Sequence, residues 1–234
     1  GANKEVMALA DKIDAFVTST LLGKGTYPER QSRSLGMLGM HGTAYANKAV
    51  VASDLVISVG SRFDDRIIGQ ASAFGKDTKI IHIDIDASEI DKMIKVDVAL
   101  VGDAKETLNS LLKLINKTSH LAWSEQIKKW KKDFPLNHDA DKNGLSMQEV
   151  LYAIQDQSKG NAVYTTDVGQ HQMWASQFIK VDNPHNWLSS GGAGTMGFAL
   201  PAAIGAQFGR PDEIVIAIVG DGGFQMTIYE LATA

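Results

Sequence analysis

Short apolar runs alternate with segments of helical periodicity along most of the chain. In the first half the pattern predicts helices at residues 5–14, 44–52 and 104–116, strands at 55–59, 79–85 and 96–101, and an extended stretch at 15–20. In the second half it predicts strands at 162–166 and 213–219 and helices at 168–178 and 196–208. Short strands separated by helices are typical of parallel sheets. We therefore expect an α/β fold made of two parallel-sheet α/β units.

A polar segment rich in Lys, Asp, Asn and His separates the two units, as is typical of an interdomain linker. Within it, residues 121–133 have helical periodicity, with Trp123, Ile127 and Trp130 on the apolar side and a run of lysines on the solvated side. A capping-box pattern, Ser-x-x-Glu at residues 146–149, opens the next helix. The predicted organisation is a domain at 1–116, a linker at 117–145 and a domain at 146–234.

Composition removes several classes of function. The 234 residues carry 23 Lys and Arg against 27 Asp and Glu, so the net charge of −4 does not suit a nucleic-acid partner. Because cysteine is absent, disulfides, thiolate metal sites and a cysteine nucleophile are excluded. The chain has neither an apolar run of about 18 residues nor a signal-peptide core. We therefore expect a soluble, cytoplasmic protein with no membrane partner.

A carboxylate flanked by glycines follows the last predicted strand, in Gly220-Asp221-Gly222-Gly223. The backbone N–H groups at the N-terminus of the following helix suit a phosphate, but an acid repels a phosphate unless a cation lies between them. Asp221 is therefore interpreted as a ligand of Mg²⁺ or a similar hard cation that bridges to a diphosphate. The alternative is an N-cap Asp in a tight turn, which an isolated Gly-Asp-Gly favours.

Two other glycine patterns are less specific. Gly192, Gly194 and Gly197 form a G-x-G-x-x-G motif. A dinucleotide site requires a good hydrophobic strand before this motif and an acid about 20 residues after it. Only a two-residue apolar run precedes the motif, so a dinucleotide site is the second hypothesis. Residues 23–26 (Gly-Lys-Gly-Thr) lack the first glycine of a P-loop, which excludes that motif.

Polar residues also follow other predicted strands, where the ligands of α/β sheets collect. Residues 166–174 directly follow one strand. Arg62 and Arg66 fit either surface salt bridges with the neighbouring acids or a clamp on a phosphate. Asp84 and Asp86 lie at the end of a strand, where an acid binds a ribose hydroxyl or caps a helix.

Five segments together resemble the thiamin-diphosphate-dependent enzymes, and within them the acetolactate synthase (acetohydroxyacid synthase) family. The Gly-Asp-Gly turn is typical of the whole superfamily. The Arg-Phe-Asp-Asp-Arg and Gly-Gln-His-Gln-Met-Trp strings are typical of the flavin-dependent biosynthetic synthase, and the likeness covers essentially the whole chain. The five segments are LGMHG at 38–42, SRFDDR at 61–66, GQHQMW at 169–174, GGAGTMG at 191–197 and GDGGF at 220–224.

The resemblance implies that the first unit is a middle domain that holds FAD, which is structural rather than redox-active in the main reaction. The residues implied to lie along the flavin are Leu38, Gly39, Met40, His41, Gly60, Arg62, Asp64, Arg66 and Ile67. Those implied to lie near its adenosine and ribitol parts are Asp84, Ile85, Gly102 and Asp103.

By the same resemblance, the second unit is the first part of a domain that binds thiamin diphosphate. The residues implied to contact this cofactor are Val168, Gly169, Gln170, His171, Gly194, Met196, Gly222 and Gly223. Asp221 matches a ligand of the Mg²⁺ ion. Met196 corresponds to the apolar residue that bends the cofactor into a V and brings its amino group against C2 of the thiazolium ring.

The implied reaction joins two molecules of pyruvate, or pyruvate and 2-oxobutyrate, with loss of CO2. The products are 2-acetolactate and 2-aceto-2-hydroxybutyrate, precursors of the branched-chain amino acids. The resemblance also implies a homodimer or higher assembly with its active site between subunits, and a regulatory small subunit.

The chain also differs from the family pattern in several features. The catalytic Glu of the family belongs to an N-terminal domain outside these residues, and no Asn follows Asp221 to complete the metal motif. The first strand of the flavin domain and most of its glycine-rich turn are also missing. The sequence therefore predicts an internal fragment that is inactive by itself.

Two other classes stay open. One is a different thiamin-diphosphate enzyme: a pyruvate oxidase, a catabolic flavin-free acetolactate synthase or a 2-oxo acid decarboxylase. Bound flavin together with acetolactate formation separates these enzymes from the biosynthetic synthase. The other class is a nucleotide-binding module without catalysis, with NAD at residues 192–197. Competition between NAD and thiamin diphosphate would reveal it.

Overall fold

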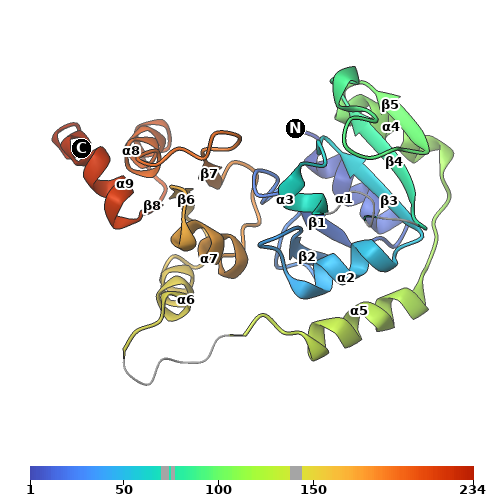
Figure 1. Cartoon of the computed structure of the whole chain (residues 1–234), viewed down its shortest axis with the longest axis horizontal. Helices are drawn as coiled ribbons and strands as arrows, with labels where there is room; N and C mark the ends of the chain where they lie inside the picture. The colour runs from blue at the N-terminus through green and yellow to red at the C-terminus, as the bar shows by residue number, and fades with distance from the viewer. Residues whose placement is uncertain (70–73, 75–76, 138–143) are drawn as a thin grey trace. The chain divides into compact units, whose positions relative to one another are not determined.

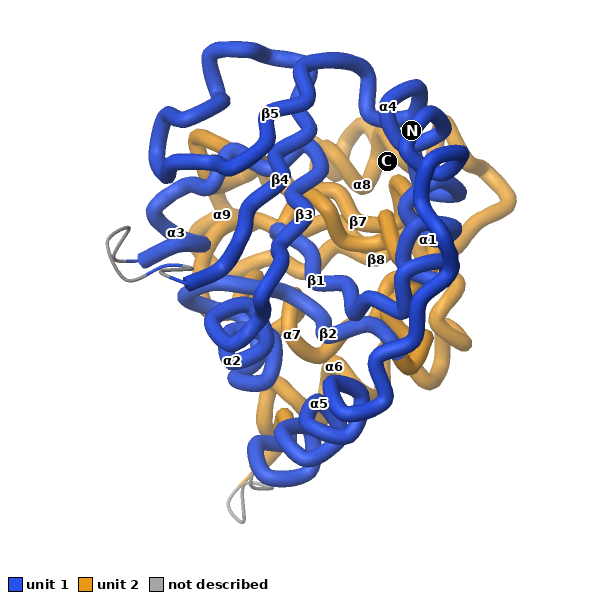
Figure 2. Tube along the Cα trace, turned by 90° about the vertical axis from the view of Figure 1, so that its right-hand side faces the viewer, with its two compact units in different colours: residues 1–20, 33–135 blue, residues 21–32, 136–234 orange. Residues whose placement is uncertain are grey.

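The computed structural model describes residues 1–69, 74, 77–137 and 144–234 (Figure 1). It divides into two compact units, coloured separately in Figure 2. Unit 1 comprises residues 1–20 and 33–135, and unit 2 comprises residues 21–32 and 136–234. The strands of both units pair in parallel and helices pack against them, which confirms the expected α/β class.

The three-stranded sheet of unit 1 has the order β3 (Leu55–Val59), β4 (Lys79–Asp84), β5 (Val98–Val101). Helices α1 (Asn3–Lys12) and α4 (Ala104–Leu114) pack together on one face, where Leu9, Leu108 and Ile83 form a core. Ile80 lies in a second core with Phe63 and Ile68. Because side chains alternate along a strand, Ile80 and Ile83 point to opposite faces of this sheet.

A second, two-stranded sheet of unit 1 pairs β1 (Val17–Ser19) with β2 (Ser34–Met37). Helix α2 (Ala44–Ala52) packs against β2 and against α5 (Leu121–Asp133). Ile127 of α5 is fully buried, and the rings of Trp123 and Trp130 meet edge to face at 5.7 Å. The predicted apolar face of this helix is therefore confirmed. Two short helices, α3 (Asp65–Ile68) and η1 (Ala87–Glu89), complete the unit.

Unit 2 contains a parallel sheet with the order β7 (Trp187–Ser189), β6 (Val163–Thr166), β8 (Val215–Ile218). Its helices are α6 (Met147–Gln157), α7 (Gln170–Phe178), α8 (Ala199–Gly209), α9 (Asp221–Met226) and η2 (Ile228–Ala232). The predicted capping box at the start of α6 is present, because Ser146 and Glu149 bind each other's backbone N–H groups.

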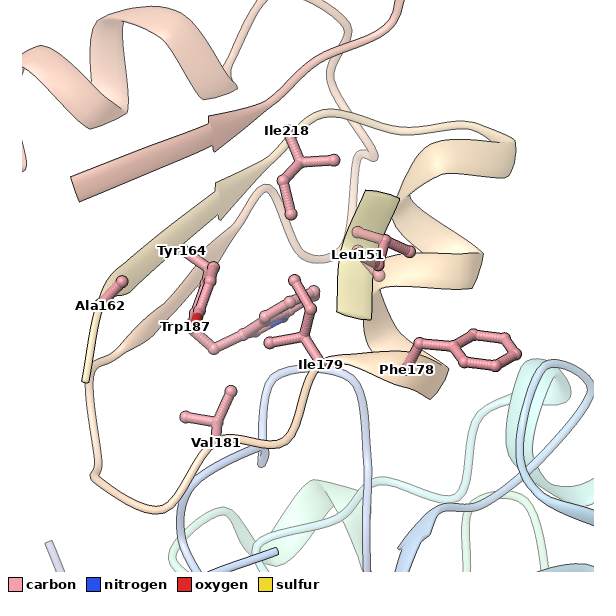
Figure 3. Close-up of a cluster of buried hydrophobic side chains, with 9 residues drawn as sticks. Leu151, Ala162, Tyr164, Phe178, Ile179, Val181, Trp187 and Ile218 are labelled. Carbon is pink, nitrogen blue, oxygen red and sulfur yellow. The ribbon is translucent and has the colours of Figure 1, made fainter. Parts of the chain in front are cut away.

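The core of unit 2 lies between the sheet and helices α6 and α7 (Figure 3). Tyr164, Ile179 and Leu151 are fully buried there. Thr165 points to the opposite face, where its hydroxyl donates to the carbonyl oxygen of Ala199 in α8 at 2.9 Å. All four residues of β6 are buried because helices cover both faces and strands flank both edges.

The division into domains differs in detail from the expected one. The structure places helix α5 with unit 1, because Ile127 completes a core with α2 and β2. It also places residues 21–32 with unit 2. The expected domains at 1–116 and 146–234 and the linker between them stay predictions. Among the described helices, none combines the length and the apolar character needed to cross a bilayer.

Candidate functional site

In unit 1, three of the expected flavin residues lie side by side at the carboxyl ends of neighbouring strands. The N–H of Gly60, after β3, donates to the carbonyl oxygen of Ile83 at 2.8 Å, and that of Gly102, after β5, donates to Asp84 at 2.9 Å. Since α/β sheets bind ligands at this edge, the strands bring Gly60, Asp84 and Gly102 to one candidate site.

Two loops of unit 1 meet through their backbones. Residues 38–42 follow β2, and the N–H of Met40 donates to the carbonyl oxygen of Arg66 at 2.7 Å. Gly39 has a φ of +99°, and a Cβ there would overlap Arg66 and Ile67. The amide of Asn47 donates to the carbonyl of Gly39 and accepts its N–H, both at 3.0 Å. The structure thus joins the two segments, 38–41 and 66–67, that the resemblance places along the flavin.

The loop at residues 61–66 contains one of the expected salt bridges, and both of its arginines are exposed. Arg62 lies 3.4 Å from Asp64 in an ion pair, but its side chain is 58% exposed, so the pair adds little stability. Asp64 also accepts the N–H of Arg66 at 3.1 Å and caps α3. The side chain of Arg66 is exposed. Both guanidinium groups therefore remain accessible to a phosphate.

The acids at the ends of β4 and β5 accept backbone hydrogen bonds in turns and at the first turns of helices. Asp84 accepts the N–H of Asp86 at 2.9 Å, and Asp86 caps η1 through Ser88. The hydrogen bonds from Ser88 lower the pKa of Asp86. Asp103 caps α4, and Ile85 is 74% exposed. The helix-cap alternative therefore holds for Asp86, whereas Asp84 lies at the end of β4, where an acid can meet a ribose.

In unit 2, three loops converge beyond the carboxyl ends of β6, β7 and β8. A Cβ built on Gly220 would lie 3.0 Å from Cε1 of His171, and one built on Gly222 would lie 3.1 Å from Cε of Met196. A Cβ on Gly194 would lie 3.5 Å from Cγ2 of Val168. The loops after β7 and β8 thus present glycine backbone to side chains of other loops. The missing side chains at these glycines let the loops pack closely against one another.

The remaining expected residues of this site lie in the same loops. Gly169 has a φ of +145° and precedes α7, and Gln170 is exposed in its first turn. Gly223 is buried, whereas the side chain of Met196 is 46% exposed. The eight residues that the resemblance assigned to thiamin diphosphate therefore all lie in these three loops.

His171 lies inside this group of loops, and its ring is partly buried. Burial lowers its pKa from 6.5, and the nearby carboxylate of Asp167 opposes the shift. Within the described part of the chain, the buried Nε2 atom has no hydrogen-bond partner. A buried ring nitrogen without a hydrogen-bond partner costs free energy, unless a ligand supplies that partner. His171 therefore fits the place where a polar group of a ligand would bind.

Asp221 does not act as a cap. The N-cap of α9 is Gly220, no side chain caps this helix, and Asp221 is its exposed first residue. The N-cap alternative is therefore wrong, and the carboxylate is available to a cation. No three His, Asp or Glu side chains among the described residues form a metal-binding group. One carboxylate still fits Mg²⁺, because this ion often binds one or two carboxylates together with phosphate oxygens and water.

The sheet order argues against the dinucleotide hypothesis. In that site, an acid ends the strand beside the one that precedes the glycine motif. Here the motif follows β7, Asp221 follows β8, and β6 lies between these two strands. Asp221 therefore cannot take the role of the ribose-binding acid for a nucleotide at residues 192–197.

The sequence analysis assigned no function to three residues that lie near these sites. Asp167 is buried and binds the glycine loop, and Asn47 holds Gly39. His82 is fully buried in β4, with its Nε2 atom 3.7 Å from Asp84. Only Asp167 had a signal in the sequence, since it directly follows a buried strand where ligands collect. The other two depend on contacts between segments.

Comparison with known proteins agrees with this arrangement. The model of the thiamine pyrophosphate enzyme central domain matches residues 1–111, and that of the C-terminal TPP binding domain matches residues 167–234. The chain belongs to the thiamine pyrophosphate (thiamin diphosphate) enzymes.

Among its relatives, the acetolactate synthase large subunits of Porphyra purpurea and Corynebacterium glutamicum are each 46% identical to it, over 99% and 100% of the chain. Acetolactate synthase 1, chloroplastic, of Nicotiana tabacum is 46% identical over 93% of the chain. The chain spans 40%, 38% and 33% of the lengths of these three relatives.

Proposed function

We propose that this chain forms the central part of an acetolactate synthase large subunit, which joins two 2-oxo acids with loss of CO2. The observation that carries the proposal is the convergence of three loops in unit 2, which carry the segments GQHQMW, GGAGTMG and GDGGF. The names of relatives that are 46% identical over nearly the whole chain support the same reaction. The substrates would be pyruvate and a second pyruvate or 2-oxobutyrate, in branched-chain amino acid synthesis.

Unit 2 would bind the diphosphate end of thiamin diphosphate. This cofactor, when bound, supplies the electron sink for carbon–carbon bond cleavage and formation. The N–H groups of Gly222 and Gly223 would bind its phosphate oxygens, and Asp221 would hold Mg²⁺ against them. The Nε2 atom of His171 would form a hydrogen bond with a polar group of the ligand. The half-exposed side chain of Met196 would provide an apolar contact.

Unit 1 would bind FAD. Arg62 and Arg66 are exposed and can pair with phosphate oxygens, and Gly39 lets the backbone of residues 38–41 come close to a flat ligand. Asp84, at the tip of β4, would accept a ribose hydroxyl. Further parts of this proposal are assembly into dimers or larger oligomers, a regulatory small subunit and a location in the cytoplasm.

The experiment has two parts. Calorimetric titration of the 234-residue chain with thiamin diphosphate and Mg²⁺, and fluorescence titration with FAD, should each show binding at one site. Turnover should be absent from the chain alone, because the family resemblance places the catalytic Glu outside these residues. A longer protein that contains this chain should form acetolactate from pyruvate.

Each outcome separates the proposal from its alternatives. Flavin binding without acetolactate formation by the longer protein would favour an oxidase. Acetolactate formation without flavin would favour the catabolic synthase. Competition of NAD with thiamin diphosphate would favour the nucleotide-binding module, and acetolactate from the 234-residue chain alone would contradict its expected inactivity.

A further inference from the structure

A buried carboxylate touches all three loops of the candidate site in unit 2. Asp167 directly follows β6 and is 1% exposed. Its backbone N–H donates to the carbonyl oxygen of Ile218, the last residue of β8. Its side chain accepts the N–H of Gly197 at 3.0 Å on Oδ2 and that of Ala199 at 2.5 Å on Oδ1. One residue therefore joins the ends of β6 and β8 to the loop that follows β7.

The contact with the third loop depends on a glycine. Gly223 packs so closely against Asp167 that a Cβ at this position would overlap Oδ2. The N-terminal turn of α9, which carries Asp221, therefore lies directly against this carboxylate. Any side chain at position 223 would force the two loops apart.

The same carboxylate supplies the missing cap of α8. Phe198, at the N-cap position of this helix, makes no side-chain cap, and its backbone is already helical. Asp167 accepts the N–H of Ala199, the first residue of the helix, from 32 positions earlier in the chain. Hydrogen bonds from backbone N–H groups to a carboxylate are about twice as strong as neutral ones, and a negative charge is stabilised at a helix N-terminus.

We propose that Asp167 is a positioning residue that fixes the three loops of the thiamin diphosphate site relative to one another. This inference rests on the proposed function for its consequence, which is tighter binding of the diphosphate. Asp167 itself is not aimed at the ligand, because its two carboxylate oxygens are taken up by Gly197 and Ala199. It sets the distance between the loop that carries Met196 and the turn that carries Asp221.

The test compares amide hydrogen exchange, followed by NMR, in variants of the 234-residue chain without any ligand. Asp167→Ala should speed exchange at the amides of Gly197 and Ala199 by about tenfold or more. Asp167→Asn keeps one acceptor oxygen, so only one of the two amides should lose protection. Should the Ala variant not fold, the Asn variant still decides the question.

Tyr164→Phe is the matched control. It removes a buried hydrogen bond of 2.9 Å to Ser158 from the same strand, but on the face that packs against α6 and α7. It should leave the exchange of the Gly197 and Ala199 amides unchanged. Unchanged protection in Asp167→Ala, or equal acceleration in Tyr164→Phe, would overturn the proposal.

A second measurement separates the inference from the function on which it rests. The dissociation constant for inorganic pyrophosphate with Mg²⁺ should rise about tenfold in Asp167→Asn and stay the same in Tyr164→Phe. If the unchanged chain binds pyrophosphate and Asp167→Asn binds it equally well, the inference fails. If the unchanged chain binds neither pyrophosphate nor thiamin diphosphate, the proposed function fails, and the exchange rates still decide whether Asp167 fixes the loops.

Discussion

Lys24 and Glu29 form a buried ion pair in unit 2, with Nζ 2.7 Å from Oε2 and side chains only 1% and 6% exposed. The ammonium group of Lys24 also donates to the carbonyl oxygens of Ser176 at 2.9 Å and Ile179 at 3.1 Å. Glu29 accepts the N–H of Val181 at 2.8 Å. Both charges therefore bind the chain at the C-terminal end of α7, the helix whose N-terminus carries Gln170 and His171.

This pair explains the Gly-Lys-Gly-Thr segment without a nucleotide. Burial lowers the pKa of Lys24, and the carboxylate of Glu29 opposes that shift. A cation is also stabilised at the C-terminus of a helix, where carbonyl oxygens lack partners. The lysine therefore anchors residues 21–32 to unit 2 and is not available to a phosphate.

Lys24→Met should destabilise unit 2 by about 3–5 kcal/mol, because it leaves the charge of Glu29 buried without a partner. The double variant Lys24→Met/Glu29→Gln should recover part of this loss. Unfolding in urea, followed by tryptophan fluorescence in a Trp123→Phe/Trp130→Phe background, reports on unit 2 through its own tryptophans.

Lys12→Met is the control for this measurement, since Lys12 donates to a carbonyl oxygen in unit 1 and should not change the unfolding of unit 2. A loss below about 1 kcal/mol in Lys24→Met would show that the pair does not anchor the segment.

Elements with a strong local pattern could be predicted from the sequence. The helices at 44–52 and 121–133 and the strand at 55–59 have the predicted bounds, because apolar periodicity and a clear break coincide at their ends. The helix expected at 196–208 begins only at Ala199, since Gly197 has a φ of +77° and interrupts it. Strands β2 and β7 were not predicted, because three or four residues carry too little pattern.

The sequence predicted which residues belong to the candidate sites, but not which of them contact one another. The glycine-rich strings identified which loops matter, and the resemblance assigned them to cofactors. The bond between Met40 and Arg66 and the two bonds of Asp167 join segments 26 to 32 residues apart, and no periodicity records such a pairing. The pairing depends on strand order, which brings loops together at one edge of a sheet.

Gly39→Ala should separate the two loops of unit 1 that are proposed to bind FAD. A Cβ would overlap Arg66 and Ile67, so we expect a loss of about 1–3 kcal/mol beyond the cost of the positive φ, and weaker FAD binding. Gly69→Ala is the matched control, because Gly69 also has a positive φ of +56° but nothing within 4 Å of its added Cβ. Urea unfolding of unit 1 and FAD titration measure the two effects.

Equal losses of stability in Gly39→Ala and Gly69→Ala would mean that backbone conformation alone sets the cost. The close approach of residues 38–41 to residues 66–67 would then contribute nothing.

His171 should titrate below its ordinary pKa of 6.5 in the folded chain, because burial disfavours the charged ring. Between the folded pKa and 6.5 the unfolded chain binds more protons, so stability rises with pH in this window. The contribution of His171 is therefore fully present above pH 6.5 and is lost as the pH falls through the folded pKa. NMR titration of the ring Cε1 proton, assigned with His171→Gln, measures this pKa.

Asp167 provides an internal check on that titration. Its carboxylate raises the pKa of His171, so Asp167→Asn should lower that pKa further. Bound pyrophosphate, by contrast, should raise it, since an anion favours the charged ring. A pKa of His171 at or above 6.5 without ligand would contradict the effect expected from partial burial of the ring.

Asp221→Asn should weaken Mg²⁺ binding without weakening the fold. Asp221 is exposed and caps nothing, so the substitution removes at most a favourable charge at the N-terminus of α9, worth about 0.3–1 kcal/mol. The affinity for Mg²⁺ in the presence of thiamin diphosphate should fall about tenfold or more, since the amide is a much weaker ligand for a hard cation than the carboxylate. Asp212→Asn removes an exposed carboxylate before the other end of β8 and should change neither property. Calorimetry and thermal unfolding distinguish the two variants, and equal Mg²⁺ affinities in both would exclude Asp221 as a metal ligand.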